Sequence, residues 1–324
     1  MSNNITNNDN NYRDNSKIIE LETKISDLEN KNNELENKLK ILEDNYNSKI
    51  KELNEKLESI LNKVNSSESP NIQKLLDFNN IAQKSWINIP GSLKQISVGK
   101  FGIFGVNKDG QIYLRDGINL ENRFGQNWIL LDGELKYISN GEYGVWGVNS
   151  RDEIYYRYNI SKKCKTGYGW TNIEGHLKML SVSCYGVWGV NSKDEIYYRE
   201  GISSHNPTGT NWVNIEGSLK YLSAGYYGLW GVNANNEIYY RENLSYKWIN
   251  IPGSLKNISV DFYGIWGVNA NNEIYYRNGL TESNHIGTEW IKIEGSLKNI
   301  SIWYYGLYGV NESDSIYTKD INLK

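Results

Sequence analysis

Apolar and polar residues alternate in short runs along residues 86–320, and the same arrangement recurs six times. Each recurrence contains four stretches rich in Ile, Val, Trp and Tyr, which favour β-strands. In the repeat that begins at Trp212, the predicted strands are Trp212–Ile215, Leu219–Ser223, Gly228–Asn233 and Glu237–Arg241. Gly217 and residues 234–236 predict turns between them. No stretch of the repeats sustains a helical period.

Each repeat opens on a tryptophan, and the spacings between these tryptophans are 42, 42, 42, 36 and 42 residues. The opening residues are Trp86, Trp128, Trp170, Trp212, Trp248 and Trp290. The fullest form of the repeat reads W-x-N-I-x-G-S-L-K-x-[IL]-S, then Y-G-[VLI]-W-G-V-N, then E-I-Y-Y-R. Four strands in about 42 residues are typical of one propeller blade. The repeats therefore predict an all-β fold, a six-bladed β-propeller.

This repeat resembles the tectonin repeat over roughly residues 86–320. The resemblance implies a six-bladed propeller and, because many tectonin-type proteins are lectins, a carbohydrate-binding function. The end repeats depart from the pattern: Phe104 replaces the inner tryptophan of the first, and Tyr308 replaces that of the last. The last repeat also reads Tyr317-Thr318-Lys319 in place of Y-Y-R.

The reading frame of the repeats predicts how the ring closes. The array begins with the strand-like segment Trp86–Ile89 and ends after the segment Ser315–Lys319. If the first segment is the outer strand of the last blade, no sheet edge stays open between the two chain ends.

The N-terminal quarter has a different pattern. Residues 1–16 are rich in Asn and are expected to be disordered. Residues 17–64 show apolar positions every three and four residues, which predicts a coiled-coil helix for self-association. These positions include Ile18, Leu21, Ile25, Leu28, Leu35, Leu39, Leu42, Leu53, Leu57 and Ile60, with Asn32 in the same series. Residues 65–80 are the predicted linker to a propeller over 81–324.

The order of this self-association stays open. Asn32, with Ile18 and Ile25 at equivalent positions, favours a parallel dimer, whereas Leu57 and Ile60 favour more strands. A single solvated helix with an apolar stripe is the alternative.

The composition of the chain limits the classes of partner that we expect. The chain has 35 Lys+Arg and 38 Asp+Glu, and residues 81–324 are nearly neutral with 24 against 23. Such a propeller has no broad positive field, so nucleic acid is not an expected partner. The two cysteines do not form a C-x-x-C pair, and no apolar run is long enough for a transmembrane segment. Without a secretory signal, we expect a cytoplasmic protein as synthesised, with non-classical release or surface display left open.

Catalytic chemistry finds no support in the sequence. The histidines His176, His205 and His285 fall at unrelated repeat positions, and no hydrolase, metalloprotease or phosphate-binding motif is present. We therefore expect no enzyme, no cofactor and no metal. The recurrent N-x-x-x-E turns resemble a calcium loop only loosely, and capping of a hairpin explains them better.

The repeated aromatic and basic residues are the candidate binding residues. We expect Trp146, Trp188, Trp230 and Trp266 to fill the spaces between blades. The candidate ligand-binding residues are Tyr143, Tyr185, Tyr227, Tyr263, Tyr305, Arg157, Arg199, Arg241 and Arg277, joined by Arg115 at the equivalent position. Strand direction places these tyrosines and arginines on the side of the disc that holds the variable loops. Each tyrosine is either a stacking platform or a loop-packing residue, and each arginine either contacts sugar or pairs within the propeller.

Two functions follow. The first is a multivalent lectin that recognises glycans on microbial or cell surfaces, which the resemblance implies and six similar blades favour. The alternative is a cytoplasmic scaffold whose propeller binds a protein or a membrane phospholipid.

Overall fold

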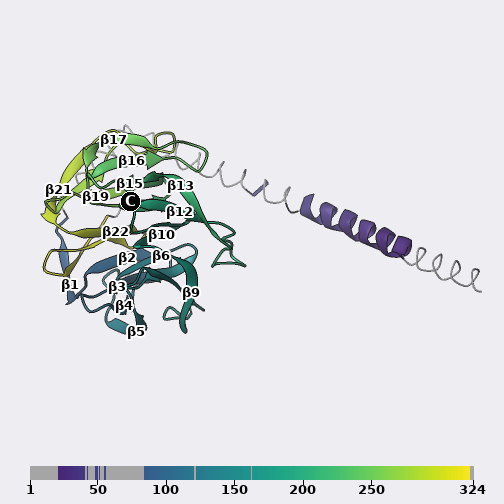
Figure 1. Ribbon diagram of the computed structural model, residues 1–324, viewed down its shortest axis with the longest axis horizontal. Helices are drawn as coiled ribbons and strands as arrows, with labels where there is room; N and C mark the ends of the chain where they lie inside the picture. Colours follow the sequence, from purple (N-terminus) through teal and green to yellow (C-terminus); the bar gives the residue numbers. More distant parts are fainter. Residues whose placement is uncertain are drawn as a thin grey trace, which may run out of the picture. The chain divides into compact units, whose positions relative to one another are not determined.

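A computed structural model of the protein describes residues 21–40, 42, 48, 49, 51, 55, 84–119, 122–161 and 163–321. The chain divides into two units, Met1–Leu76 and Asp77–Lys324. The described part of the first unit contains a helix over residues 21–40. In the described part of the second unit, 24 strands form six four-stranded antiparallel sheets (Figure 1). The predicted all-β, six-bladed propeller is confirmed.

Blades one to five take their strands in sequence order, starting with the strand nearest the centre. The first three blades contain β2 (Gln95–Gly99), β3 (Gly102–Val106), β4 (Gln111–Arg115), β5 (Trp128–Glu134), β6 (Tyr137–Gly141), β7 (Gly144–Val148), β8 (Glu153–Tyr158), β9 (Gly169–His176), β10 (Met179–Ser183), β11 (Gly186–Val190), β12 (Glu195–Arg199) and β13 (Trp212–Ser218). The next two contain β14 (Tyr221–Gly225), β15 (Gly228–Val232), β16 (Glu237–Arg241), β17 (Ile249–Ser254), β18 (Asn257–Asp261), β19 (Gly264–Val268), β20 (Glu273–Arg277) and β21 (Trp290–Ser296).

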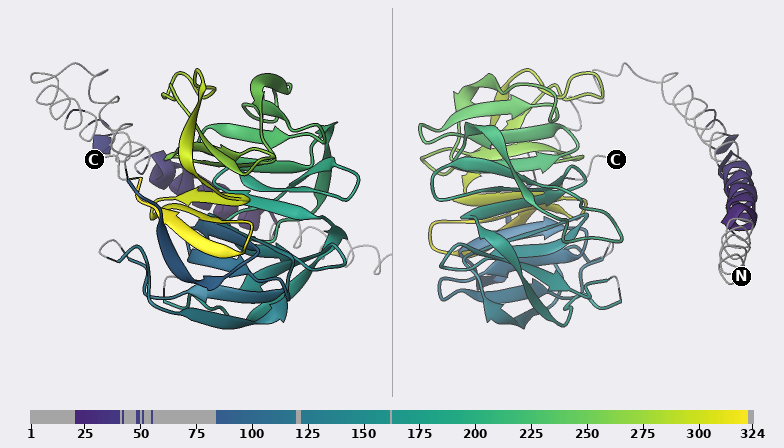
Figure 2. Two further views of the ribbon diagram at one scale, coloured as in Figure 1. Left: turned by 90° about the vertical axis from the view of Figure 1, so that its left-hand side faces the viewer. Right: turned by 45° about the vertical axis from the view of Figure 1, so that its right-hand side comes forward.

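The sixth blade joins the two ends of the propeller. It consists of β22 (Asn299–Trp303), β23 (Gly306–Val310), β24 (Ser315–Lys319) and β1 (Ile87–Ser92). In the register of β1 and β24, Ile87 lies opposite Thr318 and Ile89 opposite Ile316. The blue first strand accordingly lies beside the yellow last strands in Figure 2. The predicted ring closure is confirmed.

The outer strand of each blade is longer than the sequence predicts, because it contains a β-bulge. In the third blade, Glu195 lies opposite Ser218 but Ile196 lies opposite Ile215. Gly217, predicted as a turn, instead lies inside β13 with φ +126°. A Cβ atom there would lie 2.9 Å from Nε1 of Trp248, the opening tryptophan of the next repeat. The prediction of a turn was wrong because contact with a neighbouring blade, and not chain reversal, requires this glycine.

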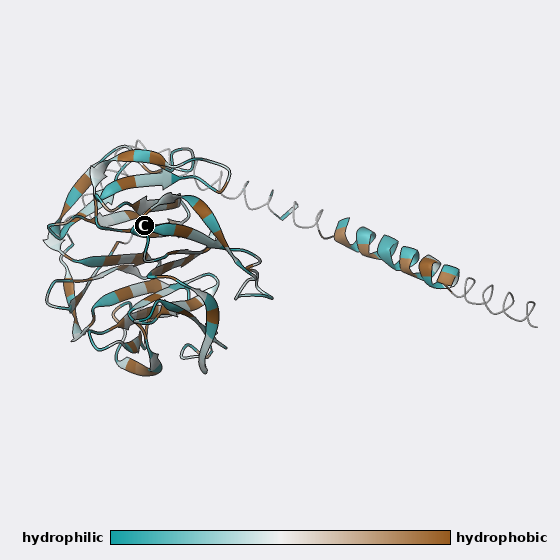
Figure 3. Cartoon of the chain, in the orientation of Figure 1, coloured by the Kyte–Doolittle hydropathy of each residue, from teal (hydrophilic) through white to brown (hydrophobic). Residues whose placement is uncertain are grey.

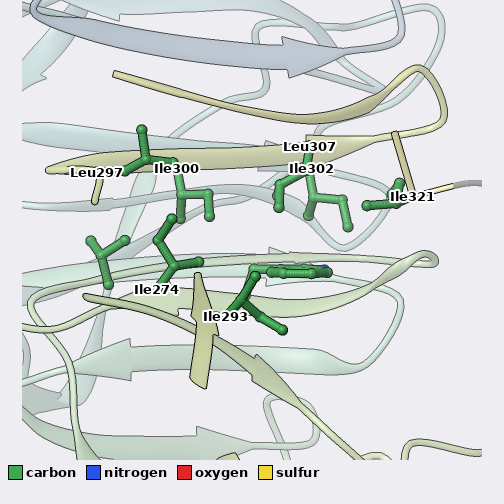
Figure 4. Close-up of a cluster of buried hydrophobic side chains, with 9 residues drawn as sticks. Ile274, Ile293, Leu297, Ile300, Ile302, Leu307 and Ile321 are labelled. Carbon is green, nitrogen blue, oxygen red and sulfur yellow. The ribbon is translucent and has the colours of Figure 1, made fainter. Parts of the chain in front are cut away.

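The hydrophobic core lies between neighbouring blades. Trp146, Trp188, Trp230 and Trp266 are at most 2% exposed, which confirms their predicted packing role. Figure 4 shows such a cluster, in which Ile274 and Ile293 of the fifth blade face Ile300 and Ile302 of the sixth. Each blade therefore depends on both of its neighbours for burial of its apolar side chains.

A ring of serines connects the innermost strands. The hydroxyl oxygen of each accepts a backbone N–H of the next blade at 2.9–3.1 Å. These residues are Ser97, Ser139, Ser181, Ser223, Ser259 and Ser301. They line a central cavity of about 50 Å³, where the hydroxyls of Tyr137 and Tyr221 also meet at 2.8 Å. This volume suits a few water molecules and is too small for a sugar.

The described helix carries an exposed apolar stripe. Leu21, Ile25, Leu28, Leu35 and Leu39 are 54–64% exposed. They recur every three or four residues except at Asn32, which holds the position between Leu28 and Leu35. Figure 3 shows apolar and polar residues alternating along this helix. The helix covers residues 21–40 of the predicted 17–64 segment, and residues 42, 48, 49, 51 and 55 of that segment are helical as well. The other residues of the segment, the predicted tail 1–16 and the whole predicted linker 65–80 lie outside the described residues. None of the described helical residues forms a segment long and apolar enough to cross a membrane.

Candidate functional site

The two sides of the propeller disc carry different connections. Turns between the first and second strands of a blade, and loops between the third and fourth, emerge on one side, here named the loop face. Turns between the second and third strands, and connections between blades, emerge on the other side, here named the opposite face. All the candidate tyrosines and arginines lie at the loop face.

The arginines lie beneath the loops of this face, at the ends of the third strands. Arg115, Arg157, Arg199 and Arg277 are only 2–5% exposed, and Arg241 is partly buried. The Nε of Arg199 donates a hydrogen bond of 2.8 Å to the carbonyl of Thr208, nine residues further along its loop. Arg115, Arg157 and Arg277 make the same bond at the same sequence distance, and Arg241 does so within its shorter loop. Each arginine therefore fixes the loop that follows it.

The guanidinium groups also stack on the opening tryptophans. Their central carbons lie 5.1–5.8 Å from the centroids of those rings, within the range of a cation–π contact. Arg157 and Arg199 further pair with Asp132 and Glu174 of the preceding blade. The hydrogen bond from Arg199 lowers the pKa of the Glu174 carboxyl.

These contacts match the second alternative for the arginines, pairing within the propeller, because loop carbonyls and tryptophan rings enclose the guanidinium groups. In the sixth blade, Lys319 takes the arginine's place and lies 5.6 Å over Trp86. Burial lowers the pKa of Arg115, Arg241 and Arg277. Direct contact between the arginines and a sugar stays a prediction.

The candidate tyrosines combine packing with exposure. Tyr185 is 37% exposed, and Tyr143, Tyr227, Tyr263 and Tyr305 are partly buried against the clusters between blades. Their backbone also supports the core, since the carbonyl of Tyr185 accepts a hydrogen bond of 2.9 Å from the indole of Trp188. Burial raises the pKa of Tyr185, Tyr227 and Tyr263. Each ring thus presents only part of its surface to solvent.

More strongly exposed aromatic side chains lie on the same face. Among the described residues of the propeller, the exposed aromatic side chains are Phe124, Tyr158, Tyr168, Tyr185, Tyr246, Phe262 and Tyr304. Six of them belong to first turns or to loops after third strands, and Tyr158 is the last residue of β8, at the same end of the blade; the opposite face has none among its described residues. Six of them were absent from the sequence prediction, which followed positions that all repeats share. They could have been found from positions that differ between the repeats: Phe262 and Tyr304 occupy the position held by Lys100 in the first blade.

The acidic residues of the opposite face stabilise its turns. The side-chain carbonyl of Asn191 accepts the backbone N–H groups of Lys193 and Glu195, and its amide donates to the Glu195 carboxylate. Asp194 occupies the left-handed conformation at φ 66° and pairs with Lys178. Hairpin capping is confirmed as the role of these residues. The described part of the chain holds no group of three or more His, Cys, Asp or Glu arranged for a metal ion.

Comparison with known proteins bears on the fold and the family. A profile described as "Tectonin domain" matches residues 64–217, 210–293 and 242–323. A search of curated proteins found no match.

Solved structures with a similar chain path are distant. They include the β-propeller domain of Cps50 (Swd1) from Myceliophteria thermophila, at 9% identity and TM-score 0.48, covering 74% of this chain and 100% of that one. YCF48 bound to D1 peptide matches at 11% identity and TM-score 0.46, covering 73% and 96%. Yeast RCC1 (Prp20), solved with Kap60, matches at 8% identity and TM-score 0.45, covering 69% and 68%. Likeness at this level says nothing about ligands.

Proposed function

The chain belongs to the tectonin domain family, and from that premise we propose that it is a multivalent carbohydrate-binding lectin, with its glycan sites on the loop face. Its role is binding and not catalysis.

One observation carries this proposal: all seven exposed aromatic side chains among the described propeller residues lie on the loop face. An exposed aromatic ring offers a flat apolar surface on which the C–H groups of a sugar can stack, and the hydroxyl groups of the exposed tyrosines add polar groups at the ring edge. Exposed apolar surface that gathers on one side of a soluble protein marks an interaction surface. The loops also supply Asn, Ser and Thr side chains for hydrogen bonds, as in the 200–211 segment.

The buried arginines support this role indirectly. Each one ties its loop to the blade through a backbone carbonyl, as Arg199 does with Thr208. A loop held in this way loses little conformational freedom when a ligand binds, which favours affinity for small polar ligands. The arginines therefore act as positioning residues for the binding loops.

The helix supports multivalency. Its apolar stripe is exposed in the single chain, and a second copy of the same helix would cover it, as in a coiled coil. We propose that this association joins two or more propellers and presents their glycan sites together. Weak sites that act together bind a glycan-bearing surface more tightly than any site alone.

A glycan array tests the proposal on the full chain. We expect binding to microbial or cell-surface glycans, and its loss when Tyr168 and Tyr246 are both replaced by Ala, since these exposed rings contribute little to folding. Lys193→Ala, an exposed change on the opposite face, is the matched control and should bind normally. If no glycan binds while phospholipid vesicles or a protein partner do, the scaffold function replaces the lectin.

A further inference from the structure

One position of the loop face divides the propeller into two halves. It is the first residue of the turn between the first and second strands. In blades one to three this position holds Lys100, Glu142 and Cys184. In blades four to six it holds Tyr226, Phe262 and Tyr304, here named the aromatic crescent.

The aromatic crescent forms one connected apolar surface. The rings of Tyr226 and Phe262 meet edge to face, with centroids 4.9 Å apart and planes at 75°. The ring of Tyr263 connects Phe262, at a centroid distance of 5.4 Å, to Tyr304, at 5.7 Å. His285, from the loop after β20, contacts Tyr226 with a centroid distance of 5.9 Å. Phe262 is 58% and Tyr304 44% exposed, so this surface is open to a partner.

Carboxylates without ion pairs accompany these rings. Asp261 directly precedes Phe262, is only 8% exposed and lines the central cavity. Tyr227, which contacts Tyr226 at 5.1 Å, experiences the negative charges of both Asp261 and Glu282. Within the described residues, neither Asp261 nor Glu282 forms a salt bridge.

Two cations of the loop face are already paired. Lys100, at the same turn position in the first blade, pairs with Glu142. Arg123, whose charge reaches Tyr263, pairs with Asp320. The aromatic crescent is therefore an apolar surface with uncompensated negative charge beside it.

We propose that the aromatic crescent binds a cationic ligand with an apolar head, namely a methylated or quaternary ammonium group. Aromatic rings attract such a group through their electron-rich faces, and a carboxylate nearby adds a charge interaction that requires no hydrogen bond from the ligand. A neutral sugar would contact the rings but would gain no net charge attraction from the carboxylates. The proposal goes beyond glycan binding and does not depend on it.

The protonation of Asp261 should modulate this site. Burial raises the pKa of Asp261 to about 7, although the backbone N–H groups of Tyr263 and Phe262 oppose the shift. The titratable groups that face it are Tyr227, Tyr263 and Cys184. The carboxyl is charged above this pKa, so binding of a cation should strengthen as the pH rises from 6 to 8.

Calorimetric titration of the full chain with choline tests the proposal. The comparison ligand is 3,3-dimethylbutan-1-ol, which has the shape of choline without its charge. We expect choline to bind about tenfold more tightly than this alcohol at pH 8, which is the usual range for cation–π contact with added charge attraction. Equal binding of the two compounds, or no binding of choline, would overturn the proposal.

Two variants assign the binding to the aromatic crescent. Phe262→Ala should weaken choline binding about tenfold, whereas Phe101→Ala, in the half without the aromatic crescent, should leave it unchanged. Asp261→Asn should abolish the dependence on pH between 6 and 8 while circular dichroism shows an intact fold. Unchanged choline affinity in Phe262→Ala would show that the cation binds elsewhere and would refute the assignment.

The source of the ammonium group can be identified in the same experiment. Binding of soluble phosphocholine, of phosphatidylcholine vesicles or of both supports the site, and the pattern tells a free ligand from a lipid headgroup. Glycan array results for the same variants keep this test separate from the lectin proposal. Loss of glycan binding alone would leave the choline result standing.

Discussion

The loop face and the opposite face are built by the same six repeats, yet they have diverged to different degrees. On the opposite face, blades two to six share a turn that opens with Asn, places Asp or Asn at positive φ and pairs that residue with a lysine. On the loop face, the loop after Arg241 is six residues shorter than its counterparts, and the first-turn position varies from Lys100 to Phe262.

This difference shows which parts of a repeat are constrained by backbone geometry. A two-strand turn on the opposite face must satisfy its own backbone groups, and few residues tolerate the left-handed conformation it needs. A loop on the other face needs only its anchor, which the arginine at the end of the third strand supplies. Beyond that anchor the sequence is free to change, and there the exposed aromatic side chains occur. Repetition therefore marks the structural positions of the blade, and the diverged positions hold most of the exposed aromatic side chains.

The largest effect is expected when aromatic rings are removed from the loop face, and unchanged glycan binding would contradict the contrast between the two faces. Replacement of four first-turn tyrosines together should abolish glycan binding, because all contribute part of a ring to that face. The quadruple variant contains Tyr143→Ala, Tyr185→Ala, Tyr227→Ala and Tyr263→Ala. Its melting temperature should fall only modestly, because these rings are partly exposed and their backbone carbonyls are retained. Normal glycan binding by the folded variant would place the sites further out in the loops.

The buried tryptophans provide the contrasting case, in which we expect a loss of stability. Trp188→Ala should lower the free energy of unfolding by about 3–5 kcal/mol, because it empties a site that is 2% exposed between two blades. Denaturant unfolding measures this loss, and Tyr185→Ala, three residues away on the loop face, is the control. If the tyrosine variant unfolds while the tryptophan variant stays stable, the assignment of packing and binding residues is reversed.

Removal of residues 1–80 tests whether the loop faces of several propellers bind a surface together. We expect a folded monomer that keeps its affinity for a single sugar but loses about 10²- to 10⁴-fold in apparent affinity for a glycan-bearing surface. Light scattering and agglutination of glycan-coated beads measure the two effects. The same oligomer with and without the segment would eliminate the helix as the joining element.

The smallest effect is expected on the opposite face. Asn191→Ala removes the acceptor for two backbone N–H groups and should cost about 1 kcal/mol of unfolding free energy. Glycan binding should not change, and Ser192→Ala, an exposed neighbour, should alter neither property. A loss of glycan affinity in Asn191→Ala would show that the opposite face takes part in recognition.

The period of about 42 residues was sufficient by itself to predict six blades, the closing strand and the buried inner tryptophans. These features depend on local alternation and on the reading frame of the repeats, and both can be read along the chain. The capping role of the Asn191 turns was equally local, since donor and acceptor lie within four residues.

Only the tertiary structure revealed features that depend on a neighbouring blade or on a loop closing over a side chain. Gly217 has its role because Trp248 packs against it, and Arg199 is buried because its loop folds back over it. The connected rings of Tyr226, Phe262 and Tyr304 come from three different repeats, about 40 residues apart in sequence. The sequence defines each blade separately. Which side chains are buried and which lie side by side is decided by the closed ring, because each blade completes its contacts only with the blades beside it.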